Sequence, residues 1–117
     1  MARKTEWHRI LTTYELEHET TPANRPVLLE VDGKNYCLVH IRGHYYVTNE
    51  KCPHAGGHLS HGQCDERGNI ICPIHRYRFD PATGKNVSGE GLYLENYQTE
   101  IRQDGLYVGI PKKSWWF

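Results

Sequence analysis

The segments Cys52-Pro53-His54 and Cys72-Pro73-Ile74-His75 are separated by 17 residues. Each motif places one cysteine and one histidine in a short stretch, so each can offer a thiolate and an imidazole to a metal centre. The surrounding region, residues 49–80, is rich in Cys, His, Pro and Gly and lacks the pattern of a core strand. A loop region of about 30 residues inside a compact domain needs something to organise it. A metal centre shared by the two motifs would do so.

The sequence on both sides of this region predicts short antiparallel strands. Asp32-Gly33 and Asp104-Gly105 each separate two strand-like runs, and an Asp-Gly pair supplies the positive φ angles of a two-residue hairpin turn. Thr12 and Glu15 have the spacing of a capping box, which predicts at most one helical turn. The expected strands lie at residues 7–11, 27–31, 36–41, 45–48, 97–102 and 106–110. We therefore expect an all-β fold.

The composition indicates one globular domain and disfavours two kinds of partner. The chain has 117 residues, and 14 Lys plus Arg balance 14 Asp plus Glu, so no overall field attracts nucleic acid. No segment approaches the ~18 apolar residues that cross a membrane, and no apolar run follows Arg3 and Lys4 as in a secretory signal. We expect a cytoplasmic protein, in which four cysteines are more readily explained by metal than by disulfides.

The mixed ligand pairs distinguish two kinds of metal centre. Structural zinc sites typically pair like with like along the chain, Cys with Cys and then His with His. A [2Fe–2S] centre with two cysteines on one iron and two histidines on the other needs one residue of each kind from each loop. Cys52 with His54 and Cys72 with His75 meet that demand. The spacing favours the iron–sulfur centre, and a zinc site remains the alternative.

The two motifs and their surroundings resemble the cluster-binding boxes of Rieske ferredoxins. The first box is CPHAGGHLSHG at residues 52–62, and the second is CPIHRYRFD at residues 72–80. The turn at residues 81–85 is similar to theirs too. The resemblance implies a Rieske-like antiparallel β-sandwich base with a small inserted cluster-binding subdomain. One Rieske domain would then cover residues 1–117, with its base at 1–48 and 81–117 and its cluster-binding subdomain at 49–80. One [2Fe–2S] cluster would be held by Cys52, His54, Cys72 and His75, with the histidines nearest to solvent.

Four positions depart from the Rieske proteins of cytochrome bc-type complexes. Those proteins carry an additional, disulfide-bonded cysteine in each box, where this chain has Gly57 and Ile74. They also carry a serine and a tyrosine that donate hydrogen bonds to the cluster's sulfur atoms, where this chain has Tyr77 and Phe79. A phenyl ring cannot donate, so the resemblance implies a reduction potential toward the low end of the Rieske span, roughly −150 to 0 mV.

The function expected from these features is electron transfer. The leading hypothesis is a soluble carrier of one electron between a reductase and a terminal oxygenase or similar enzyme, so its partners would be redox proteins. An alternative is a small Rieske subunit of a nitrite-reductase-like complex. A third is a structural zinc-binding interaction module. The chain has no Gly-x-Gly-x-x-Gly fingerprint for a nicotinamide cofactor, so we expect a component of an oxidoreductase system rather than a complete enzyme.

Five further features have simpler explanations. His58 and His61 are expected to be surface histidines rather than ligands. Cys37 is expected in the core and Cys64 in an exposed turn. The terminal Trp115-Trp116-Phe117 could dock a partner or cover the small core.

Overall fold

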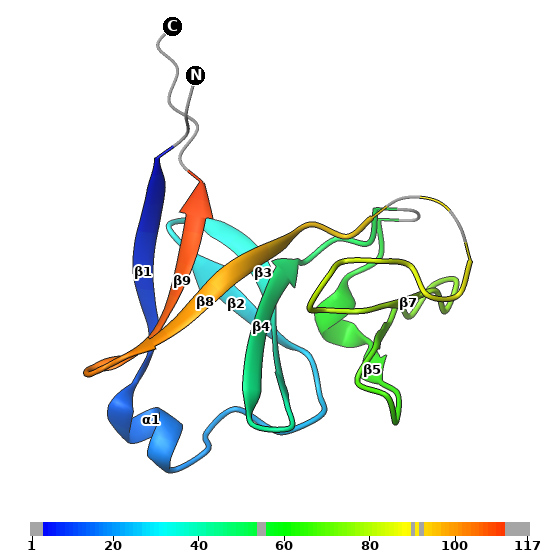
Figure 1. Ribbon diagram of the computed structural model, residues 1–117. Coiled ribbons are helices and arrows are strands. Elements are labelled where there is room, and N and C mark those ends of the chain that lie inside the picture. The colour runs from blue at the N-terminus through cyan, green and yellow to red at the C-terminus, as the bar shows by residue number, and fades with distance from the viewer. Residues whose placement is uncertain (1–3, 54–55, 90, 92, 112–117) are drawn as a thin grey trace, which may run out of the picture.

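The fold is nearly all-β in the computed structural model (Figure 1), which describes residues 4–53, 56–89, 91 and 93–111. This confirms the expected fold class. The terminal Trp115-Trp116-Phe117 lies outside the described residues. The elements are β1 (Thr5–Thr12), α1 (Thr13–Glu17), β2 (Val27–Val31), β3 (Lys34–Ile41), β4 (His44–Asn49), the 3₁₀ turn η1 (Leu59–His61), β5 (Gln63–Cys64), β6 (Ile70–Ile71), β7 (Arg78–Phe79), β8 (Asn96–Arg102) and β9 (Gly105–Pro111).

A six-stranded antiparallel sheet with the order β1-β9-β8-β4-β3-β2 forms the larger part of the molecule. The half formed by β1, β9 and β8 packs on the half formed by β4, β3 and β2 through a shared core. Leu11 of β1 and Leu106 of β9 belong to the same buried cluster as Leu38 of β3 and Val47 of β4. The sheet therefore curls around its own apolar face, because a single layer would leave that face in water.

Tight turns set the register of the hairpins. Asp32 and Gly33 have φ angles of 53° and 81°, as a two-residue turn between β2 and β3 requires. The hairpin between β8 and β9 differs from the expected one, because Arg102 pairs with Gly105 and the turn consists of Gln103 and Asp104 rather than of Asp104 and Gly105. A Cβ atom on Gly105 would lie 2.1 Å from the Leu11 carbonyl oxygen, so glycine is required there by close approach of the backbone.

The expected capping box at the start of α1 is confirmed. The backbone N–H of Glu15 donates to the Thr12 hydroxyl at 3.1 Å, and the backbone N–H of Thr12 donates to the Glu15 carboxylate at 2.8 Å. The helix has only five residues, in agreement with the single turn expected. No helix in the described part of the chain is long and apolar enough to cross a membrane.

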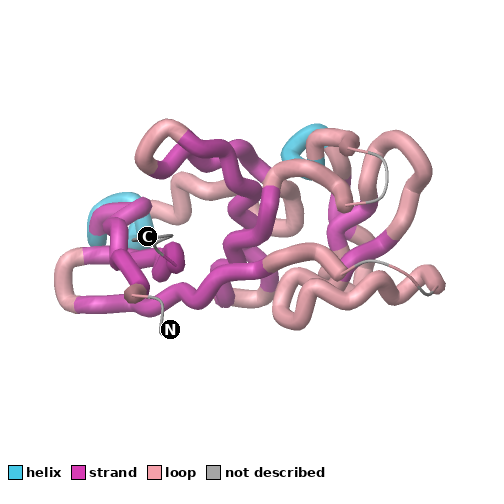
Figure 2. Tube along the Cα trace, turned by 90° about the horizontal axis from the view of Figure 1, so that it is seen from above, coloured by secondary structure: helices cyan, strands magenta, loops and turns pink. Residues whose placement is uncertain are grey.

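A second, three-stranded sheet of order β5-β6-β7 lies beside the large sheet. Loops dominate the half of the molecule that carries it (Figure 2). Cys64, which was expected in an exposed turn, instead lies in β5, pairs with Ile70 and is half-buried. That burial raises the pKa of the Cys64 thiol to about 11. The short strands at 63–64 and 70–71 were missed because two residues carry no visible alternation.

Candidate metal centre

Three of the predicted ligands lie in two loops: Cys52 follows β4, and Cys72 and His75 lie between β6 and β7. Cys52 is 2% exposed and Cys72 is fully buried, whereas His75 is exposed to solvent. His54 lies outside the described residues. Two thiols therefore lie inside the protein, while the one described imidazole lies at its surface. This arrangement is the one expected for thiolate and imidazole ligands.

The first ligand loop closes through two backbone hydrogen bonds. The Cys52 N–H donates to the Gly57 carbonyl at 2.8 Å, and the Gly56 N–H donates to the Cys52 carbonyl at 2.9 Å. Gly56 has a φ of 70°, a left-handed conformation that glycine adopts without strain. These bonds force the chain to reverse within six residues.

The second ligand loop is built in the same way. The Cys72 N–H donates to the Tyr77 carbonyl at 2.8 Å, and the Arg76 N–H donates to the Cys72 carbonyl at 2.9 Å. Arg76 has a φ of 59°, so it takes the left-handed position that Gly56 takes in the first loop. The two motifs thus fold into equivalent loops, which the similar sequences suggested but did not prove.

The two loops face each other at Gly57. A Cβ atom at this position would lie 3.1 Å from Cys72 Sγ and 2.9 Å from Ile74 Cδ1. A side chain at this position would therefore require the exposed end of Ile74 to turn aside and Cys72 Sγ to shift slightly. Glycine at position 57 lets the backbone of one loop approach the thiol of the other.

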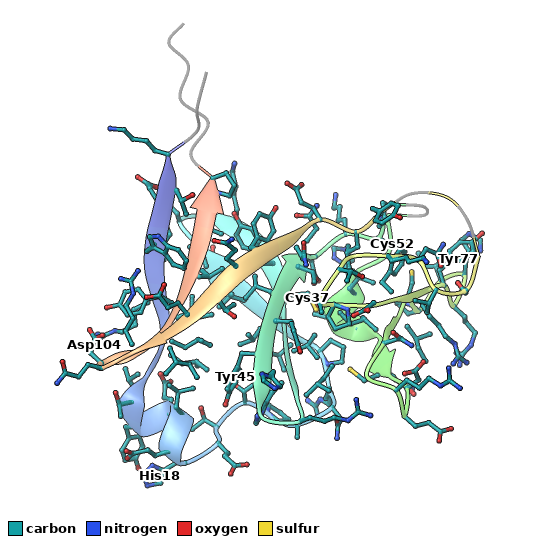
Figure 3. All side chains as sticks on the ribbon, in the orientation of Figure 1. His18, Cys37, Tyr45, Cys52, Tyr77 and Asp104 are labelled. Carbon is teal, nitrogen blue, oxygen red and sulfur yellow. The ribbon has the colours of Figure 1, made fainter. Side chains whose placement is uncertain are left out.

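The thiols are buried by a compact apolar cluster under the loops. Figure 3 shows Cys52 and Tyr77 in this loop-rich part of the molecule. The other buried members of the cluster are Cys37, Val39, Ile41, Leu59, Ile70, Phe79 and Leu94. Cys37 is fully buried, as expected, and burial raises the pKa of its thiol far above the ordinary value. The four cysteines, all within the described residues, form no disulfide.

Two aromatic residues of the second box lie close to the ligands. Phe79 is fully buried in the apolar cluster that includes both Cys52 and Cys72. Tyr77 is half-buried, and its ring centroid lies 6.0 Å from that of His75. The position that could carry a buried hydroxyl near the thiols is thus occupied by a phenyl ring.

A buried carboxylate at position 50 was missed by sequence reasoning. Its oxygens accept hydrogen bonds from Ser60 N at 3.1 Å and Ser60 Oγ at 2.5 Å, and His58 Nδ1 lies 3.4 Å away. His58 and His61 are exposed, with ring centroids 5.4 Å apart. The signal available in the sequence was an acidic residue, Glu50, directly after a strand. This signal is weak, since most such residues are solvated.

The donor set fits an iron–sulfur centre. Equivalent loops each bring a thiol to the shared interior, and the second loop presents its imidazole outside. A centre with two irons, one held by two thiolates and the other by two imidazoles, needs this division. Among the described residues, no three His, Cys, Asp or Glu side chains gather around a point where a single ion could bind.

A separate cavity of about 1000 Å³ lies between α1, the β3-β4 turn and the β5-β6 turn. It is lined by His40, Tyr45 and Arg102 among others, and by none of the predicted ligands. The cavity is therefore distinct from the candidate metal centre.

Comparison with known proteins gives a consistent family match. Residues 6–97 match the family model described as the Rieske [2Fe-2S] domain. The ferredoxin component of the naphthalene 1,2-dioxygenase system of Pseudomonas aeruginosa is 31% identical over 106 residues, which cover 90% of this chain and 96% of that protein.

Two solved structures share the fold. The ferredoxin of carbazole 1,9a-dioxygenase from Nocardioides aromaticivorans IC177 has a TM-score of 0.74 at 23% identity, covering 93% of this chain and 99% of its own. A protein from Mycobacterium tuberculosis, assigned as the small subunit of an NADH-dependent nitrite reductase, has a TM-score of 0.76 at 18% identity, covering 91% and 96%. At these identities the likeness concerns the fold alone.

Proposed function

This chain belongs to the Rieske [2Fe–2S] domain family, and we propose that it carries single electrons between a reductase and a terminal oxygenase or similar enzyme. The observation that carries the proposal is the pair of equivalent ligand loops, each closed around its cysteine and facing the other at Gly57. When bound, the [2Fe–2S] cluster of this family accepts and returns one electron without the movement of heavy atoms that bond-making chemistry needs.

We propose that Cys52 and Cys72 hold the inner iron and that His54 and His75 hold the outer one. Burial of both thiols supports the first assignment, and exposure of His75 supports the second. The chain's own contribution is to exclude water from the sulfur side and to leave one imidazole edge exposed. Electrons would pass through that edge.

Residues 1–117 are proposed to form one Rieske domain with its base at 1–48 and 81–117 and its cluster-binding subdomain at 49–80. We also propose a cytoplasmic location, in which the cysteines remain reduced and form no disulfide. The relative from Pseudomonas aeruginosa is the ferredoxin component of a naphthalene 1,2-dioxygenase system, which supports a reductase and an oxygenase as partners.

The small subunit of a nitrite-reductase-like complex remains the alternative. Similarity to the M. tuberculosis protein supports it only at the level of the fold. The two functions differ in whether a large subunit stays bound. Affinity capture of the chain from its native cell separates them, because a stoichiometric large reductase subunit would support the alternative and transient redox partners the carrier.

The direct test of the proposal is metal analysis of the purified chain. We expect two irons and two acid-labile sulfides per chain, and we expect the visible spectrum to be lost when His75 is replaced by alanine. The surface histidine substitution His61→Ala is the matched control and should keep the spectrum. Colourless protein containing one zinc would support a structural zinc module and end the proposal.

A further inference from the structure

Glu50 carries a buried carboxylate two residues before Cys52. It lies in the neck of the first ligand loop, which consists of residues 50–51, where the chain enters the loop, and residues 58–60, where it leaves. Its side chain is only 5% exposed, although glutamate is almost never fully buried unless its charge is paired or hydrogen-bonded. Burial of this group costs free energy, so its partners must compensate.

All the described partners of Glu50 lie on the other side of the same loop. Its carbonyl accepts from the Leu59 N–H at 2.8 Å. Its carboxylate oxygens accept from the Ser60 N–H at 3.1 Å and the Ser60 hydroxyl at 2.5 Å. The His58 ring nitrogen lies 3.4 Å from the same carboxylate. One side chain thus ties the strand that enters the loop to the turn that leaves it.

The two ligand loops differ in how their necks are closed. The second loop rises from β6 and β7, which are paired in a ladder that includes Ile71 and Arg78. At the neck of the first loop, the described residues form one isolated strand bridge, between Lys51 and His58. The Glu50 carboxylate continues this short ladder by side-chain hydrogen bonds, and hydrogen bonds to a charged group are stronger than those between neutral groups.

We propose that Glu50 is a positioning residue that closes the neck of the first ligand loop and thereby fixes where Cys52 lies opposite Cys72. This inference rests on the proposed function. Without the carboxylate, the Ser60 N–H loses its acceptor and the neck keeps only its backbone bonds. The loop then moves relative to the second loop, and the ligand geometry changes with it.

The test compares Glu50→Ala and Glu50→Gln with the wild-type chain. Three properties are measured: the rate of iron loss to a chelator, the EPR g values of the dithionite-reduced protein, and the midpoint potential. Glu50→Ala is expected to lose iron about tenfold faster and to show altered g values. Glu50→Gln keeps an oxygen that can accept from Ser60 N, so it should restore most of the wild-type iron retention and the wild-type g values.

The matched control is Glu100→Ala, which removes a glutamate paired with Arg102 at 2.9 Å on the exposed surface of β8. It should leave all three properties unchanged. Ser60→Ala removes one donor and keeps the backbone N–H, so it should lie between wild type and Glu50→Ala. Should Glu50→Ala fail to fold, Ser60→Ala tests the proposal in its place. Faster iron loss and altered g values in Ser60→Ala would support it, and wild-type values would overturn it.

A lower melting temperature with wild-type iron retention, g values and potential would show a merely structural role and overturn the inference. That result would leave the proposed function intact. Absence of iron and sulfide from the wild-type chain would instead overturn the proposed function, and the inference with it.

Discussion

At the scale of single residues, Gly57 gives the sharpest prediction. Gly57→Ala would place a methyl group 3.1 Å from Cys72 Sγ and 2.9 Å from Ile74 Cδ1. Overpacking costs roughly 1–3 kcal/mol, and we expect the low end here, because the exposed Ile74 side chain can turn aside and the remaining strain falls on Cys72, a proposed ligand. We expect a several-fold lower iron content per chain, measured by metal analysis after purification.

Gly89→Ala is the control for that substitution. No atom lies within 4 Å of a Cβ at Gly89, so an added methyl group meets no neighbour. Its iron content should match the wild type. Equal iron content in both variants would contradict the close contact between the two loops.

Phe79 gives a second prediction at this scale. Phe79→Tyr adds a hydroxyl to the buried cluster that contains both thiols. A hydrogen bond to sulfur stabilises the added electron, so the midpoint potential should rise from a wild-type value of roughly −150 to 0 mV. Redox titration monitored in the visible range measures it. An unchanged potential in a variant of normal stability would show that the ring does not reach the cluster.

At the scale of elements, the β5-β6 turn depends on one carboxylate. Burial by itself would raise the pKa of Asp65, but donors from Asn69, Arg67 and Arg78 outweigh that effect and lower it. Because the folded pKa lies below the unfolded one, Asp65 stabilises the fold above the unfolded pKa of ~3.9, and this stability is lost as the pH falls through the folded value.

We therefore expect Asp65→Asn to lower the free energy of unfolding by about 1–2 kcal/mol at pH 7. The difference from wild type should shrink below about pH 4, where Asp65 becomes protonated in the unfolded chain. Urea unfolding across this pH range measures it. Asp104→Asn, at an exposed pair with Arg9, should show a much smaller effect. A difference that does not vary with pH would contradict the role of the charge.

At the scale of the whole molecule, the two halves depend differently on the cluster. The six-stranded sheet has strands of five to eight residues and its own buried core. The smaller sheet has strands of two residues each, and its core includes two proposed ligands. Metal binding couples to folding where the site crosslinks segments that are weakly held otherwise.

Removal of iron and sulfide should therefore raise amide exchange mainly across residues 50–79 and leave β1, β8 and β9 protected. Hydrogen exchange measured by mass spectrometry on the holoprotein and the cluster-free chain tests this difference. Uniform loss of protection across both sheets would show instead that the domain folds only with its cluster.

Much of this architecture is encoded locally. Asp32-Gly33 determines its turn because the required φ angles belong to those two residues, and Thr12 with Glu15 caps α1 through bonds three residues apart. The four proposed ligands are equally local, since Cys-Pro-His and Cys-Pro-x-His contain both donor types within one loop. Local sequence therefore predicts the β2-β3 turn, the helical turn and the two ligand motifs.

Features that depend on segments far apart in the chain could not be predicted from the sequence. The need for glycine at Gly105 comes from a carbonyl of β1, and that at Gly57 from a thiol of the other loop. Cys64 is half-buried because β6 pairs with it, and Glu50 is buried because the chain returns at Ser60. Such contacts carry no local pattern, because their free energy arises only when distant segments pack against one another.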